Sequence, residues 1–259
     1  MARILITNDD GIDAPGIQEL GRAVHSAGHD VVMVAPLNEA SGPGAAIGFI
    51  LDGTRIRYEQ RDIAGLEGCT TVGVEGPPAR CVLLAFLGAF GERPDLVLSG
   101  INPGVNTGRG LLHSGTVGAV LSAADFGISG MAVSIDCAMS HHTASWETAN
   151  AVVLRSLPYL LEAPRKTALN VNVPDLAEPA GFAVTRQGKR RYGDAVIEKY
   201  DPRGRKYYWI GGVELDYQDE PGTDFSAIHA GLVSVTPLHL DLTNYEAMDS
   251  VKAMRLAWP

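Results

Sequence analysis

The chain has 259 residues, 46% of them hydrophobic and 20% charged, which is enough to bury the core of one large domain, with or without an elaboration. Its 21 Lys and Arg residues against 30 Asp and Glu give a formal net charge of −9. This balance argues against a protein that wraps a nucleic-acid polymer, because affinity for that polymer comes mainly from basic side chains. It leaves open a small phosphorylated ligand, since a bound cation can supply local positive charge.

Nothing in the sequence predicts export or membrane insertion. The apolar run over residues 1–7 is too short for a signal peptide, and no run reaches the roughly 18 apolar residues of a membrane span. The three cysteines, Cys69, Cys81 and Cys137, are odd in number and lack a CxxC pair, so we expect reduced thiols. These features predict a cytoplasmic protein that does not contact a membrane.

The first two thirds of the chain alternate between predicted strands and helices. Hydrophobic periodicity and turn residues predict, in chain order, a strand over 3–7, a helix over 15–27 capped by Gly28, a strand over 30–35, and short antiparallel strands between 47 and 74. The same patterns then predict a helix over 78–90, a strand over 95–98, a helix over 115–126, a strand over 130–135, a helix over 146–161 and a strand over 167–173.

This alternation predicts an α/β fold. Strands joined by helices form a mostly parallel sheet with right-handed crossovers and helices on both faces. Ligands of such sheets collect where the strands end. Candidate functional residues are therefore sought directly after each strand.

The last third of the chain has a different composition. Residues 181–206 are rich in Arg and Lys, residues 206–212 are aromatic, a strand is predicted over 231–238 and a helix over 244–256. We therefore expect a catalytic core over 1–175 and a second part over 176–259 that holds a β-hairpin or arm, a returning strand and a terminal helix. Such an excursion is typical of contact with a second subunit, but also of a solvated β-extension on one monomer.

The first candidate motif, Asn8-Asp9-Asp10-Gly11, directly follows the first strand. Adjacent carboxylates repel each other, and a hard divalent cation is a good reason for their presence, because Mg²⁺-type ions take oxygen ligands. The alternative is a capped turn, since Asp and Asn cap helices and Asp-Gly favours turns. Ser41 follows the second strand and offers a hydroxyl oxygen, although Ser-Gly in a loop is usually only a turn.

The densest motif, SGINPGVNTG over residues 99–108, follows the strand over 95–98. Its glycines let backbone amides approach an anion, and Asn102 and Asn106 offer both a carbonyl oxygen and an amide donor. The next helix begins at His113-Ser114-Gly115-Thr116, and a helix N-terminus is an anion-binding position. The two segments predict a phosphate cradle; the alternative is a glycine-rich turn followed by an ordinary helix cap.

Several other classes of site lack their motifs. The sequence has no GxGxxG after the first strand, no GxxxxGK[ST] and no GxSxG, so dinucleotide binding, P-loop chemistry and a nucleophile elbow are unsupported. Adjacent acids in place of DxD disfavour a phospho-aspartate intermediate. His141-His142 is better explained by a solvated helix start than by a metal pair.

Taken together, these stretches resemble the SurE family of metal-dependent nucleotidases. The resemblance rests on ILITNDDGIDAPGIQEL, VVMVAP with ASG, PDLVLSGINPGVNTG, HSGTVGAVLSAADFGISGMAVS, ALNVNVPDL and GTDFSAIHAGLVSVTPLHLDLT, and it spans nearly the whole chain. It implies a Rossmann-like core and a β-rich C-terminal arm that exchanges between subunits of a homodimer or homotetramer.

The resemblance also implies a metal-dependent phosphomonoesterase that acts on nucleoside monophosphates or a related small metabolite. One Mg²⁺ or Mn²⁺ per subunit would be held by Asp9, Asp10, Ser41 and Asn102. The phosphate would face Asn106, Ser114, Gly115 and Thr116. Direct roles in catalysis would fall to Asp9, Asn106, His113 and Ser114, with the proton donor left open between the last two. A catalytically weak nucleotide-binding or metabolite-binding relative, and a purely structural protein, are the alternatives.

The sequence departs from the family pattern around the implied substrate site. A run resembling DRNRSG is usual before the loop serine, but residues 37–42 read LNEASG and contain no arginine. The usual serine-rich turn is replaced by PGAA over 43–46, and the stretch resembling GTPxDC reads GPPARC over 76–81. The implied metal ligands are kept while their surroundings change, so we predict an altered choice of substrate.

Overall fold

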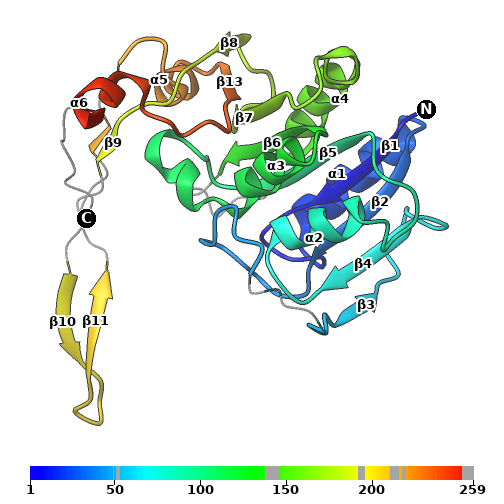
Figure 1. Ribbon diagram of the computed structural model, residues 1–259, viewed down its shortest axis with the longest axis horizontal. Helices are drawn as coiled ribbons and strands as arrows, with labels where there is room; N and C mark the ends of the chain where they lie inside the picture. Colours follow the sequence, from blue (N-terminus) through cyan, green and yellow to red (C-terminus); the bar gives the residue numbers. More distant parts are fainter. Residues whose placement is uncertain are drawn as a thin grey trace.

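The computed structural model describes residues 1–48, 50, 53–137, 146–191, 196–210, 216–217 and 220–252 (Figure 1). His141 and His142 lie outside these ranges. The first part of the chain forms β1 (Arg3–Thr7), α1 (Pro15–Ser26), β2 (Asp30–Pro36), β3 (Tyr58–Gln60), β4 (Thr70–Val74), α2 (Pro78–Phe86), β5 (Leu96–Pro103), η1 (Gly108–His113), α3 (Gly115–Asp125), β6 (Ser129–Asp136), α4 (Trp146–Glu162) and β7 (Ala168–Pro174).

One nine-stranded sheet organises the described chain, in the order β3-β4-β2-β1-β5-β6-β7-β13-β8. The six strands from β4 to β7 in this order are parallel to one another. Ile4 of β1 lies between Val31 of β2 and Leu96 of β5. The predicted α/β class, with a mostly parallel sheet, is confirmed.

Alternating side chains of the central strands build a core on each face of the sheet. Ile4 and Ile6 of β1 pack in a cluster with α1 and α4, whereas Leu5 packs with α2 and α3 on the other face. All three side chains are fully buried. Because successive strand residues point to opposite faces, an almost continuously apolar β1 requires helices on both sides.

The structure differs from the prediction in three boundaries or pairings. Among the described residues between 47 and 74, β3 and β4 pair antiparallel as expected, but β4 also joins β2 in parallel, which buries Val72 and Val74. Helix α2 ends before residue 90 because Gly88 adopts φ +85° and terminates the helix. Strand β5 continues through the glycine-rich segment to Pro103, with a register shift between Ser99 and Asn102.

The second part of the chain forms β8 (Phe182–Val184), β9 (Arg190–Arg191), β10 (Val196–Tyr200), β11 (Lys206–Ile210), β12 (Asp216–Tyr217), α5 (Asp224–His229), β13 (Val233–Leu238), η2 (Tyr245–Ala247) and α6 (Met248–Lys252). Strand β13 extends the sheet by pairing antiparallel with β7 and parallel with β8. The division at residues 175 and 176 stays a prediction. The predicted terminal helix is described only to residue 252.

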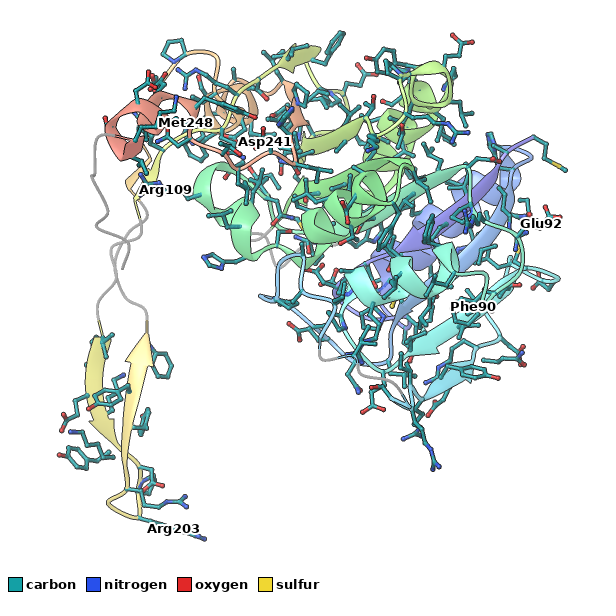
Figure 2. The ribbon with its side chains drawn as sticks, viewed as in Figure 1. Phe90, Glu92, Arg109, Arg203, Asp241 and Met248 are labelled. Atoms are coloured by element: carbon teal, nitrogen blue, oxygen red, sulfur yellow. The ribbon has the colours of Figure 1, made fainter. Side chains whose placement is uncertain are left out.

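The β10–β11 hairpin projects away from the sheet (Figure 1), and Figure 2 shows Arg203 at its tip. All five residues of β10 are exposed. Within the described ranges, no helix is long and apolar enough to cross a bilayer.

Candidate active site at the carboxyl ends of β1 and β5

The candidate site lies where the order of the sheet reverses. The chain passes from β1 to β2 on one side and later returns to β5 on the other side of β1. The crevice beyond the carboxyl ends of two such strands is the usual ligand position in open α/β sheets. Asp9 and Asp10 follow β1, and Asn102 lies near the end of β5.

A tight turn after β1 orients the first acid. The Asn8 side chain donates to the Gly11 carbonyl at 3.0 Å and accepts from the Gly11 amide at 3.2 Å. Gly11 adopts φ +102°, a conformation that favours glycine. The Ala40 amide donates to the Asp9 carbonyl at 2.7 Å, so the loop that carries Ser41 is joined to this turn.

Asp9 connects the turn to the start of α3. Its side chain is 4% exposed, and Oδ1 accepts a hydrogen bond from Thr116 Oγ1 at 2.5 Å. Thr116 Oγ1 also lies 3.4 Å from Asn102 Oδ1, so acid, hydroxyl and amide meet at one point. Burial raises the pKa of Asp9, although the Thr116 hydroxyl and the amides of Thr116 and Gly115 oppose the rise.

Asp10 holds the polar atom that is hardest to explain without a ligand. Its Oδ2 is buried and has no hydrogen-bond partner in the described structure. Burial, together with the charges of Asp9 and Glu39, raises the pKa of Asp10 to about 7. A buried acceptor without a donor is costly, and a hard cation would satisfy it.

The four predicted metal ligands supply only oxygen donors, which fits Mg²⁺ or Mn²⁺. Among the described residues, no three His, Cys, Asp or Glu side chains gather to hold an ion. A cation here would therefore use the carboxylates of Asp9 and Asp10, the Asn102 carbonyl, the Ser41 hydroxyl and water. Asn102 Nδ2 donates to the Gly104 carbonyl at 2.6 Å, which directs Oδ1 to the side of Thr116 Oγ1, 3.4 Å away.

Ser41 is exposed, and its hydroxyl donates to Glu39 Oε1 at 3.1 Å. The remainder of its loop packs closely on α3. The Gly44 amide donates to the His113 carbonyl at 3.2 Å, and an ideal Cβ on Gly118 would lie only 2.2 Å from Gly44 O. Glycine at position 118 therefore permits the contact that brings this loop to the start of the helix.

The start of α3 combines a capping hydroxyl with amides directed at Asp9. Ser114 is 7% exposed and its Oγ accepts from the Val117 amide at 3.2 Å, so it is the N-cap of an eleven-residue helix. An ideal Cβ on Gly115 would lie 2.8 Å from Asp9 Cβ, which explains the need for glycine there. His113 is exposed beside this helix start.

Asn106 is held by three polar residues that the sequence analysis did not single out. Its Nδ2 donates to Ser134 Oγ at 2.8 Å, its backbone amide donates to Asn172 Oδ1 at 2.8 Å, and its carbonyl accepts from Asn170 Nδ2 at 2.8 Å. All three partners are fully buried. Polar residues at alternate positions of the apolar strand β7 were the available signal, because a buried amide needs a partner.

Asp224 was also missed. Its carboxylate is fully buried and accepts from the amides of Gly108 at 2.7 Å and of Gly188 and Phe225 at 2.8 Å. Gly108 begins η1, which leads to His113 and Ser114. The second part of the chain thus positions a segment of the site. The available signal in the sequence was an acid directly after Thr223, a residue type that caps helices.

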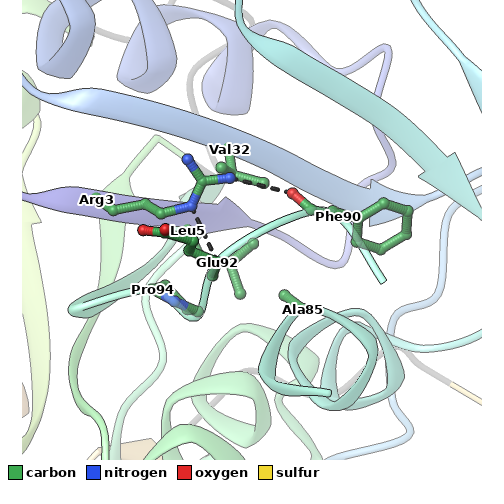
Figure 3. A pocket seen from close by; sticks show the side chains of 7 residues that line it. All are labelled: Arg3, Leu5, Val32, Ala85, Phe90, Glu92 and Pro94. Carbon is green, nitrogen blue, oxygen red and sulfur yellow. Dashed lines mark hydrogen bonds between the residues drawn. The ribbon is translucent and has the colours of Figure 1, made fainter. Parts of the chain in front are cut away.

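An open hollow of about 450 Å³ adjoins Ser41 and Glu39 and reaches the start of α2. A separate recess lies at the opposite, amino end of β1, below Arg3 (Figure 3). There Arg3 donates to the carbonyls of Glu92 at 3.0 Å and Phe90 at 3.1 Å. This recess has essentially no space for even a water-sized group, so the hollow at Ser41 is the better ligand position.

The fold and this geometry define an α/β protein of the doubly wound class with a candidate cation and anion site at its switch point. The family model described as survival protein SurE matches residues 4–194. The chain therefore belongs to the SurE family, and the resemblance is confirmed.

Curated relatives and a solved structure agree with this assignment. The chain is 43% identical to the 5'-nucleotidase SurE of Geobacter metallireducens over 98% of both chains. It is 42% identical to the 5'-nucleotidase SurE of Xanthomonas campestris pv. campestris, covering 96% of this chain and 94% of that one. The crystal structure of the SurE protein from Aquifex aeolicus superposes with a TM-score of 0.80 at 39% identity, covering 97% of this chain and 98% of that chain.

Proposed function

We propose that this protein is a divalent-metal-dependent phosphomonoesterase that acts on nucleoside monophosphates or a closely related small phosphorylated metabolite. The observation that carries the proposal is the buried, unpartnered Oδ2 of Asp10 beside Asp9, next to the N-terminus of α3. The name 5'-nucleotidase, borne by relatives that match this chain over nearly its whole length, supports the substrate class.

In this proposal one Mg²⁺ or Mn²⁺ per subunit binds Asp9, Asp10, Ser41 and Asn102. When bound, the ion polarises the phosphoryl oxygen and lowers the pKa of a coordinated water. Thr116 holds the Asp9 carboxylate in place, since its hydroxyl donates to Oδ1. The amides of Gly115 and Thr116 bring positive partial charge to the same point, which favours a bound phosphate.

Asn106 and Ser114 complete the phosphate site in the proposal. The hydrogen bonds from Asn170, Asn172 and Ser134 fix the Asn106 loop, so its amide needs little reorganisation when charge develops on the phosphoryl oxygens. His113 and Ser114 are the two candidates that protonate the leaving oxygen. The exposed imidazole is free to approach it, whereas the Ser114 hydroxyl stays at the helix cap.

The proposal extends to assembly and location. In the β10–β11 hairpin, Tyr208 is 62% exposed and Trp209 is 50% exposed. Contact with a second copy of the chain would bury these aromatic side chains and so stabilise the hairpin. We propose a homodimer or homotetramer that acts in the cytoplasm without nucleic-acid or membrane partners. None of the three described cysteines forms a disulfide, which supports a reducing compartment.

A catalytically weak binding protein is the second candidate. The hydrogen bond from Ser41 to Glu39 favours it, because this acid stands where related proteins commonly lack one and adds a third negative charge beside Asp9 and Asp10.

An assay of phosphate release separates the two candidates. The substrates are nucleotides, sugar phosphates and an aryl phosphate, each tested with Mg²⁺, with Mn²⁺ and with chelator. Metal-dependent turnover is expected. Folded protein that gains thermal stability with ligand, but releases no phosphate from any substrate, would support the binding protein instead.

A further inference from the structure

The hollow beside Ser41 has a composition that suits one kind of ligand. Its apolar lining comes from Leu37, Pro43, Ala46, Val74 and Pro77. Its volume of about 450 Å³ lies within the ordinary range of small-molecule sites. It therefore has room for a group of nucleoside size with an apolar face.

The charges at this hollow are negative. Glu39 and Glu75 are among the lining residues, and no Lys or Arg is among those that the structure describes there. A second phosphate would meet like charge, whereas an uncharged group with hydroxyl or amino donors would find carboxylate acceptors.

Arg80 makes the hollow rigid without contributing a free cation. Its Nε donates to the Ile47 carbonyl at 2.9 Å and Nη1 to the Glu75 carbonyl at 3.0 Å, so one side chain joins two walls. Ideal Cβ atoms on Gly48 and Gly76 would lie 2.2 and 2.8 Å from the Arg80 side chain, which shows how closely both walls pack on it.

We propose that this hollow is the leaving-group subsite of the enzyme and selects an uncharged group, of the nucleoside class, over a leaving group that carries a second phosphate. The inference rests on the proposed phosphomonoesterase function, because Ser41 belongs both to the hollow and to the proposed metal site. In it, Glu39 determines the charge preference and Arg80 is a positioning residue.

The test compares Ala46→Trp, which fills the hollow, with Ala45→Trp at an exposed neighbour that does not line it. The substrates are adenosine 5'-monophosphate, adenosine 3',5'-bisphosphate and methyl phosphate, which has almost no leaving group. Ala46→Trp is expected to raise KM for the monophosphate on the order of tenfold, and to raise it far less for methyl phosphate. Ala45→Trp is expected to leave all three KM values unchanged.

Glu39→Gln tests the charge preference, since it keeps the shape of the side chain. It is expected to raise kcat/KM for the bisphosphate relative to the monophosphate roughly three- to tenfold. Metal-dependent turnover with equal KM values for Ala46→Trp and wild type would overturn the subsite and leave the phosphomonoesterase intact. An unchanged substrate ratio in Glu39→Gln would overturn the charge preference.

Calorimetric titration with adenosine alone separates the two proposals if no substrate is turned over. The subsite would be supported, even without turnover, if adenosine binds wild type and Ala45→Trp equally well and binds Ala46→Trp on the order of tenfold more weakly. Equal affinity of adenosine for all three proteins would overturn the subsite.

Discussion

The strand-end site and the β10–β11 hairpin differ in what they bury: the site buries polar groups, whereas the hairpin leaves apolar groups exposed. At the site, polar groups such as Asp9, Thr116 and Asn172 are buried and fixed by short hydrogen bonds. In the hairpin, aromatic side chains such as Tyr208 and Trp209 remain exposed on two strands that, within the described part of the chain, form a sheet of their own. Burying polar groups costs stability unless they are bonded, and exposing apolar groups forgoes stability unless a partner covers them.

The two regions obtain their stability from different sources. The site draws on the core of its own chain, because β7 holds it from the first part of the chain and Asp224 holds it from the second. The hairpin adds little to that core, so its value would lie in contact with another subunit.

The largest effect is expected for Asp9→Asn. The substitution removes the negative charge of a proposed metal ligand but keeps an oxygen that can accept from Thr116, so metal-dependent phosphate release should fall on the order of 10³-fold. Asp13→Asn is the matched control, since this acid follows the same turn but its side chain is 66% exposed. Equal loss in both variants, measured as kcat/KM, would contradict a special role for Asp9.

Asp224→Ala is expected to have the next largest effect, and this effect is on stability. It leaves the amides of Gly108, Gly188 and Phe225 without their acceptor, so the free energy of unfolding should fall by about 2–4 kcal/mol. Urea denaturation measures this, with Asp249→Ala as the control because that side chain is 92% exposed. A drop below about 0.5 kcal/mol would mean that Asp224 does not join the two parts of the chain.

The acids at the site predict a pH dependence of the metal-free protein. The pKa of Asp10 rises from 3.8 to about 7 on folding, so above pH 4 the unfolded chain loses a proton that the folded chain keeps. The free energy of unfolding should therefore fall by about 1–2 kcal/mol from about pH 4 to pH 7 and level off above pH 7. This figure is reduced because Asp10 is partly screened by solvent. Asp10→Asn, or saturating Mn²⁺ at pH 8, should remove this loss, and thermal melts that keep the same slope in Asp10→Asn would refute the account.

The smallest effect on the stability of the single chain is expected for substitutions in the β10–β11 hairpin. The double variant Tyr208→Ser with Trp209→Ser should change the free energy of unfolding of the isolated chain by less than about 0.5 kcal/mol, since both side chains are exposed. Light scattering should nevertheless show a loss of dimer or tetramer. Unaltered oligomeric mass, or a large loss of chain stability, would break the contrast between the two regions.

Much of the fold could be predicted because the central strands and their helices carry strong local patterns. The strand over Arg3–Thr7 and the positions of α1, α3 and β6 follow from apolar periodicity and glycine or proline boundaries. The pairing of β4 with β2 could not be predicted, because the partner of a strand is chosen by tertiary packing. The extent of β5 was likewise hidden by its glycine-rich residues.

The sequence by itself determined the α/β class, the family and the short motifs after β1, β2 and β5. Only the tertiary structure decided that Thr116 bonds Asp9, that Asp10 keeps an unpartnered oxygen, and that Glu39 meets Ser41. It alone revealed that Asp224 holds Gly108 from 116 residues away. The reason is physical: periodicity reports which face of an element is buried, whereas hydrogen bonds between distant segments depend on how those elements pack.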